Sequence, residues 1–96
     1  MTALRKFNAK RDASEPEVVR AFTDLGCLVF RLDRPVDLLV YVFKSLSDRL
    51  HLVEVKTAKG DLNDKQKEFR AAGWPVHVIR SADEAIALVK NLREGA

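Results

Sequence analysis

Apolar residues recur every three or four positions early in the chain, between Ser14 and Gly26. This spacing places them on one face of a helix, which we expect over residues 15–25. Ser14 can serve as its N-cap, and Pro16 falls in the first turn, where the missing N–H costs little. Gly26 ends the pattern, since glycine readily adopts the left-handed conformation that closes many helices.

Two further segments with helical spacing lie in the second half of the chain. Asn63 can cap the first of them, which we expect over residues 64–72 and which Gly73 ends. Ser81 can cap the second, whose apolar stripe is expected to consist of Ala85, Ile86, Leu88, Val89 and Leu92.

Short apolar segments rich in Val, Leu, Ile and Phe predict four β-strands. They cover residues 27–32, 36–43, 50–55 and 75–80. The polar segment 44–49 is turn-like and joins the second and third strands as a hairpin. In the third strand apolar and polar side chains alternate, so that its two faces differ.

The resulting order of elements is α-β-β-β-α-β-α, which predicts an α/β fold. We expect a mixed four-stranded sheet flanked by helices, with the first three strands as an antiparallel meander and the fourth reached by a crossover. A chain of 96 residues supports one domain, assigned to residues 14–96. Residues 1–13 show no sustained periodicity and are expected to form a basic arm.

Composition narrows the class of protein further. With 47% hydrophobic and 32% charged residues the chain is expected to fold, and its longest apolar run, 38–43, is far shorter than a membrane span needs. The net charge of +3 belongs to the arm, because basic and acidic residues are equal in number elsewhere. Cys27 is the only cysteine, which excludes an intrachain disulfide. With no apolar signal segment at the N-terminus, a cytoplasmic location is expected.

Three ionisable residues lie within or beside the apolar strands. Asp37 interrupts the second predicted strand near its start. Glu54 and Lys56 lie two positions apart on the third, so their side chains point to the same face. If these strands pair as a hairpin, Asp37 and Glu54 converge, and two carboxylates repel unless a cation lies between them. Such oxygen ligands favour Mg²⁺ or Mn²⁺, beside which Lys56 could orient or deprotonate a water.

These residues belong to a wider pattern that resembles a known nuclease family. Asp37 followed by Glu54-Val55-Lys56 is similar to the PD-(D/E)XK signature. Around it stand VFRLDRPVDLLV, HLVEVKTAKGDLNDKQKEF and VHVIRSADEAIALV, after a helix that begins SEPEVV. Over residues 12–92 the chain resembles a stand-alone VRR-NUC (virus-type replication-repair nuclease) domain, and its layout is similar to that of archaeal Holliday-junction resolvases.

The resemblance implies a PD-(D/E)XK core and a role for each matching residue. Asp37 and Glu54 would be the central metal ligands, and the backbone carbonyl of Val55 would supply another. Lys56 would be the catalytic lysine. The resemblance thus implies a Mg²⁺- or Mn²⁺-dependent deoxyribonuclease that hydrolyses phosphodiester bonds.

Two helices are expected to support this site. Glu15 matches the acid of the first helix that supports the metal, with Glu17 as the alternative if the helix register differs. Gln66 matches a glutamine that approaches the site from the second helix. If the chain is a nuclease, phosphate contacts are expected from Arg31, Arg34, Lys59, Lys65 and Arg11.

The resemblance also implies partners. Related stand-alone domains and resolvases are associated with homodimers, and two sites related by a two-fold axis suit branched DNA such as junctions or flaps. We therefore expect a homodimer that acts on branched or duplex DNA, in DNA repair of a bacterium or a bacteriophage.

Simpler interpretations stay open beside these. Asp37 could cap a loop N–H, and Glu54 with Lys56 could be a solvent-facing pair of little energetic value. The domain could keep the nuclease fold but act as a DNA-binding or partner-recruiting module, with Arg34 and Val36 marking a weakened site. It could also be a purely structural interaction protein.

Three aromatic or imidazole side chains carry no expected role in the chemistry. His51 and His77 have no metal-like spacing, so each is expected to be a structural or surface histidine. Trp74 is expected to pack at the edge of the sheet.

Overall fold

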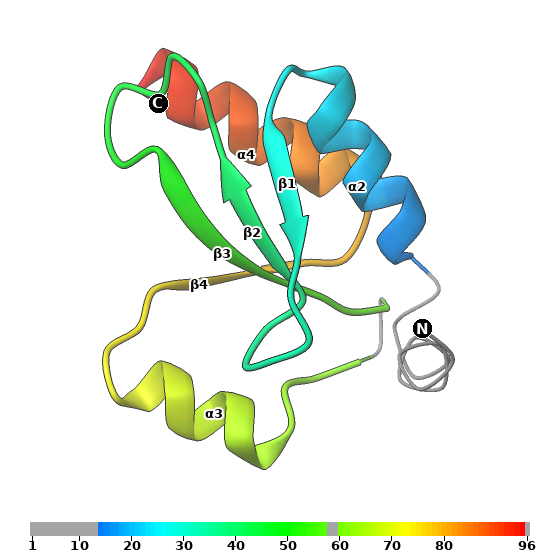
Figure 1. The fold of residues 1–96 in the computed structure, drawn as a ribbon, viewed down its shortest axis with the longest axis vertical. Helices are drawn as coiled ribbons and strands as arrows, with labels where there is room; N and C mark the ends of the chain where they lie inside the picture. Colours follow the sequence, from blue (N-terminus) through cyan, green and yellow to red (C-terminus); the bar gives the residue numbers. More distant parts are fainter. Residues whose placement is uncertain (1–13, 58–59, 96) are drawn as a thin grey trace.

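The sheet and helices follow the predicted order in the computed structural model, which describes residues 14–57 and 60–95 (Figure 1). The strands lie side by side as β1-β2-β3-β4. The first three form an antiparallel meander, and β4 pairs in parallel with β3. The elements are α2 (Glu15–Asp24), β1 (Leu28–Arg31), β2 (Leu38–Tyr41), β3 (Leu50–Val55), α3 (Asp64–Ala71), β4 (Val76–Ile79) and α4 (Ala82–Glu94). The predicted α/β fold with a mixed four-stranded sheet is therefore confirmed.

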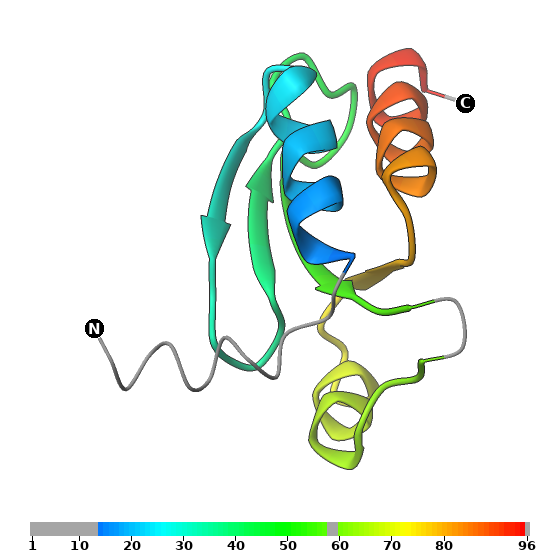
Figure 2. The same ribbon diagram turned by 90° about the vertical axis from the view of Figure 1, so that its right-hand side faces the viewer.

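Helices α2 and α4 lie together against one face of the sheet and enclose the core (Figure 2). Val18 and Phe22 of α2 are fully buried there, as are Val40, Val53 and Val89 from β2, β3 and α4. Each such side chain contributes about 1.5–3 kcal/mol through its burial. The alternation of side chains along β3 turns His51, Val53 and Val55 toward this core.

The other face of the sheet carries apolar side chains that no helix of the described part of the chain covers. Pairing places Leu28, Tyr41 and Leu50 in one row across β1, β2 and β3. Phe30 belongs to the next row and is 65% exposed. Such a large apolar surface is unusual for an isolated domain.

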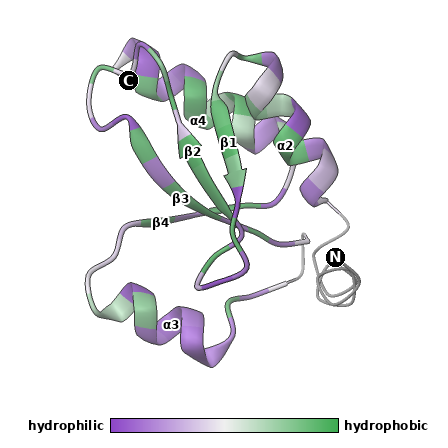
Figure 3. Cartoon of the chain, in the orientation of Figure 1, coloured by the Kyte–Doolittle hydropathy of each residue, from purple (hydrophilic) through white to green (hydrophobic). Residues whose placement is uncertain are grey.

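Helix α3 stands apart from both layers, beyond one end of the sheet (Figure 1). None of its residues is fully buried. Figure 3 shows it largely hydrophilic, whereas the strands are largely hydrophobic. This helix is held through its ends and through a stacked contact between Phe69 and Trp74.

The caps of the helices agree with the predictions in two cases out of three. Asn63 and Ser81 each accept a hydrogen bond from a backbone N–H in the first turn of α3 and α4. Ser14 makes no side-chain capping bond, because its own backbone is already helical at φ −76° and ψ −13°. Gly26 closes α2 with a left-handed backbone of φ 82°, as expected.

Two further predictions need correction. The second strand is shorter than predicted, since Val36 and Asp37 lie in the bend before Leu38. The stripe of α4 is narrower than predicted: Ile86 is 43% exposed, whereas Ala85 and Val89 are buried. A helix that packs on a flat layer buries only the centre of its apolar face. In the residues that the structure describes, no helix is long and apolar enough to cross a membrane.

Candidate active site

Asp37 and Glu54 meet where β2 begins and β3 ends. Leu38 pairs with Val53, so the next pair in the antiparallel register is Asp37 and Glu54. The Asp37 Oδ2 atom accepts a hydrogen bond of 2.8 Å from the Val55 N–H, which fixes this carboxylate against β3. The structure thus brings the two acids together. It also shows Asp37 accepting from a backbone N–H, which is the simpler role that the sequence left open for this residue.

Glu54 is buried, with 2% of its surface exposed. The Nζ atom of Lys56 lies 3.1 Å from its Oε2 atom, so the pair is a buried ion pair and not a solvent-facing one. Its Oε1 atom is buried with no hydrogen-bond partner in the described residues. Burial raises the pKa of Glu54, and the Asp37 charge raises this pKa further, whereas Lys56 and Gln66 lower it.

The ion pair with Lys56 reaches only the Oε2 atom of Glu54, so the negative charge of this carboxylate is only partly balanced. A buried carboxylate oxygen without a partner costs several kcal/mol unless a cation or a donor reaches it. The residues present therefore fit a hard divalent cation held by the carboxylates of Asp37 and Glu54 and by the carbonyl of Val55.

Gln66 reaches this site because of how α3 begins. The N–H of Asn63 donates to the Gln66 Oε1 atom at 3.0 Å, and the Gln66 N–H donates to Asn63 Oδ1 at 2.8 Å. This capping box engages the carbonyl oxygen of the Gln66 side chain and leaves its NH₂ group to donate. Gln66 also lowers the pKa of Glu54, which favours the charged form of that carboxyl.

Glu15 is buried at the start of α2, with 1% of its surface exposed, while Glu17 is exposed. Of the two alternatives for the helix acid, the interior position thus belongs to Glu15. Its Oε2 atom lies 3.3 Å from the Nε atom of Arg31 on β1. Within residues 14–57 and 60–95, no three His, Cys, Asp or Glu side chains form a group that could hold a metal. Glu15 is thus paired with Arg31, and its support of a metal site stays a prediction.

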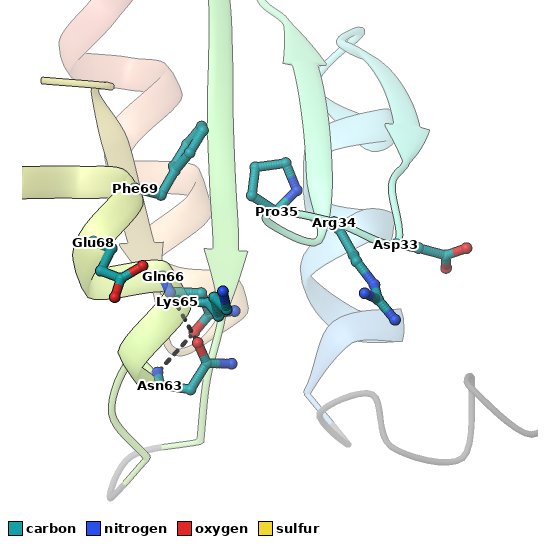
Figure 4. A pocket seen from close by; sticks show the side chains of 8 residues that line it. All are labelled: Asp33, Arg34, Pro35, Asn63, Lys65, Gln66, Glu68 and Phe69. Carbon is teal, nitrogen blue, oxygen red and sulfur yellow. Dashed lines mark hydrogen bonds between the residues drawn. The ribbon is translucent and has the colours of Figure 1, made fainter. Parts of the chain in front are cut away.

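A cavity of about 710 Å³ opens between α3 and the loop that joins β1 to β2, and Gln66 is part of its lining (Figure 4). Arg34 and Lys65, both expected to contact phosphates, line this cavity, and Arg31 is half exposed at the end of β1. The other two expected contacts, Lys59 and Arg11, lie outside the described residues. The lining consists of Asp33, Arg34, Pro35, Asn63, Lys65, Gln66, Glu68 and Phe69.

Arg80 is a residue that the sequence did not single out. Its guanidinium donates to the carbonyl of Thr57 at 2.8 Å and to the carbonyl of Gly60. The backbone N–H of Arg80 donates to the Glu84 Oε1 atom at 2.7 Å, and this bond connects the end of β4 to α4. Arg80 therefore holds both ends of the segment that follows Lys56 and leads to α3.

The two histidines also proved to be neighbours. The Nδ1 atom of His51 lies 3.1 Å from the Nε2 atom of His77, and the Nε2 atom of His51 lies 2.7 Å from the carbonyl oxygen of Asp48. A carbonyl only accepts, so the His51 Nε2 carries a hydrogen and its Nδ1 accepts from His77. Burial lowers the pKa of His77, and His51 and Arg70 lower it further. The two histidines thus form a contact between β3 and β4.

Comparison with protein-family models, with curated proteins and with solved structures gave no match to this chain. The function therefore has to be argued from the residues of the site.

Proposed function

We propose that the protein is a Mg²⁺- or Mn²⁺-dependent DNA endonuclease with a PD-(D/E)XK core of the VRR-NUC type. One observation carries the proposal: the partnerless, buried Oε1 atom of Glu54 lies in a site shared with Asp37 and Lys56. A buried carboxylate beside a second acid lowers stability and serves no packing purpose, which is typical of a site built for chemistry.

The roles of the residues follow from their contacts. Asp37, Glu54 and the Val55 carbonyl would hold the metal. When bound, this metal supplies polarisation of the scissile phosphate and a water of lowered pKa. Lys56 forms an ion pair with Glu54. In this proposal the Lys56 ammonium orients a water or offsets negative charge that develops on the phosphate. Gln66 lowers the pKa of Glu54 and so favours the charged carboxylate that a metal ligand requires.

Glu15 acts at a distance in this proposal. Its ion pair with Arg31 fixes the end of β1, from which the chain enters the loop that carries Arg34. Glu15 would therefore be a positioning residue that supports the metal site without being a direct ligand.

Cleavage of labelled DNA tests the proposal. A panel of linear, flap, gapped and junction substrates is incubated with the full chain in Mg²⁺, Mn²⁺ or EDTA. We expect metal-dependent cleavage that Asp37→Ala, Glu54→Ala and Lys56→Ala each abolish. Lys67→Ala is the matched control, because its ammonium is exposed and lies 3.9 Å from the exposed Asp61 carboxylate. Full activity in the three site variants would refute the nuclease assignment.

A binding module with a weakened site is the second candidate. The observation that favours it is that Glu15 is paired with Arg31 and adds no third acid to the site. Titration calorimetry with Mn²⁺ separates binding from catalysis, since an intact site binds the ion and Asp37→Asn loses it. Mn²⁺ binding and DNA binding without cleavage would favour the module.

Two further expectations are part of the proposal. A homodimer is supported by the exposed side chains of Leu28, Phe30 and Leu50 on this face, since a second copy could cover them. Light scattering of the wild type and of Phe30→Asp tests it, with a monomeric wild type as the refuting result. A reducing, cytoplasmic setting is proposed from the buried, unpaired Cys27, whose pKa is raised by burial.

A further inference from the structure

We propose that the cavity between α3 and the β1–β2 loop binds an unpaired nucleobase, so that the substrate carries an unpaired nucleotide next to the phosphate that is cut. The inference rests on the proposed function for its link to cleavage. The base site itself is argued from the walls of the cavity.

The cavity has a size that suits a base, and rings are part of its lining. Its volume of about 710 Å³ lies within the range of about 300–1,000 Å³ that is typical of sites for small molecules. Pro35 of the β1–β2 loop and Phe69 of α3 both line the cavity, from its two sides (Figure 4). Aromatic rings hold bases by stacking, which is favourable for every base because each has a π face.

The ring of Phe69 is supported from outside the cavity. It is stacked on Trp74 with ring centroids 5.3 Å apart and an angle of 2° between the planes. Phe69 lines this cavity and Trp74 does not, so the stack meets the cavity through Phe69. A base there would extend an existing parallel stack by one layer.

The charges of the lining favour a base over a phosphate alone. Arg34 and Lys65 are balanced by Asp33 and Glu68, so the formal charge of the lining is zero. A site for phosphate alone would carry excess positive charge. The carboxylate of Glu68 can accept from the exocyclic amine of a base, and the Asn63 amide can donate, since its oxygen already caps α3.

The position of the cavity connects base binding to the cut. Gln66 lines the cavity and also acts on Glu54, so the base site and the carboxylates share one side chain. A base within a duplex is stacked and paired, and removing it costs a few kcal/mol, whereas an unpaired base enters without this cost. The favoured class of substrate is therefore DNA with an unpaired nucleotide at a boundary between single and double strand.

Fluorescence of 2-aminopurine tests the inference without requiring cleavage. The base analogue is placed either unpaired at a boundary between single and double strand or paired within a duplex, and the full chain is added in EDTA. We expect strong quenching of the unpaired analogue only. Phe69→Ala should abolish the quenching and weaken binding about tenfold or more, in line with the loss of one stacked base.

Matched variants keep the result interpretable. Phe69→Tyr preserves a flat ring and should keep the quenching, whereas Phe69→Leu preserves bulk without the ring and should lose it. Phe43→Ala removes another exposed aromatic side chain, which follows β2 at the end opposite the β1–β2 loop, and should quench as the wild type does. Equal quenching in wild type, Phe69→Leu and Phe69→Ala would overturn the base site, as would equal quenching of paired and unpaired analogues.

The outcomes also separate this inference from the nuclease proposal. Quenching that depends on Phe69, without any metal-dependent cleavage, would support the base site and refute the nuclease. Metal-dependent cleavage without such quenching would refute the base site and leave the nuclease proposal intact.

Discussion

Replacement of Glu54 by glutamine should raise the stability of the metal-free protein. Glu54 holds a buried oxygen without a hydrogen bond, next to the charge of Asp37. An unsatisfied buried group costs about 1–3 kcal/mol, and the ion pair with Lys56 offsets part of this. Because glutamine removes the charge and can still accept from Lys56, we expect a net gain of about 1 kcal/mol in EDTA. For a domain of this size, that corresponds to a rise of about 4–8 °C in Tm.

In the presence of a divalent metal, the wild type should become more stable than Glu54→Gln. A ligand at one hundred times its Kd adds about 2.7 kcal/mol to the free energy of unfolding. The wild type should gain this in Mn²⁺, while Glu54→Gln should gain much less because a ligand carboxylate is missing.

Thermal melts followed by circular dichroism at pH 8, in EDTA and in Mn²⁺, measure both effects. Glu94→Gln is the control, since Glu94 is exposed at the end of α4 and its variant should shift by a few tenths of a kcal/mol in either buffer. A Glu54→Gln protein that is less stable than wild type in EDTA would show that the ion pair with Lys56 is a structural contact, and the metal interpretation would fail.

The remaining predictions concern other parts of the chain. The pKa of His77 is lowered below its ordinary 6.5, so the unfolded chain binds more protons and stability should fall below about pH 6.5, by at most about 1.4 kcal/mol per pH unit. Urea unfolding at pH 5.5 and 7.5 measures this, and a His77→Gln protein that keeps the same dependence would contradict it. Arg80→Gln should lower kcat/KM for DNA cleavage severalfold with a small change in Tm, because the carbonyls of Thr57 and Gly60 lose their hydrogen bonds to the guanidinium. An unchanged kcat/KM would exclude a positioning role for Arg80. Deletion of residues 1–12 should weaken DNA affinity and its salt dependence without abolishing cleavage, and equal affinity at low salt would show that the arm is incidental.

Local patterns in the sequence predicted most of the fold. Helical spacing located α2, α3 and α4, and the single register of the β2–β3 hairpin was enough to bring Asp37 and Glu54 together. The capping box likewise depends only on Asn63 and Gln66, which lie three positions apart in the chain. Contacts of this kind depend on neighbours in the chain, so periodicity and turn chemistry predict them.

The contacts that escaped prediction depend on how distant elements pack. His77 meets His51 only because β4 pairs with β3 in one particular parallel register, which no local pattern determines. Arg80 reaches back to Thr57 for the same reason. The cavity between Pro35 and Phe69 requires the placement of α3 beside the β1–β2 loop, and the spacing of residues along the chain does not contain that information.

Helix α3 contributes no fully buried residue to the core. Its displacement therefore costs little hydrophobic free energy, and its amide hydrogens should exchange with solvent far faster than those of β2 and β3. Asp37 and Glu54 lie at the ends of strands in the stable sheet. Gln66 and Phe69 belong to α3, which the core holds only weakly. The carboxylates thus lie on the more stable part of the fold, whereas the residues of α3 beside them can move at little cost in free energy.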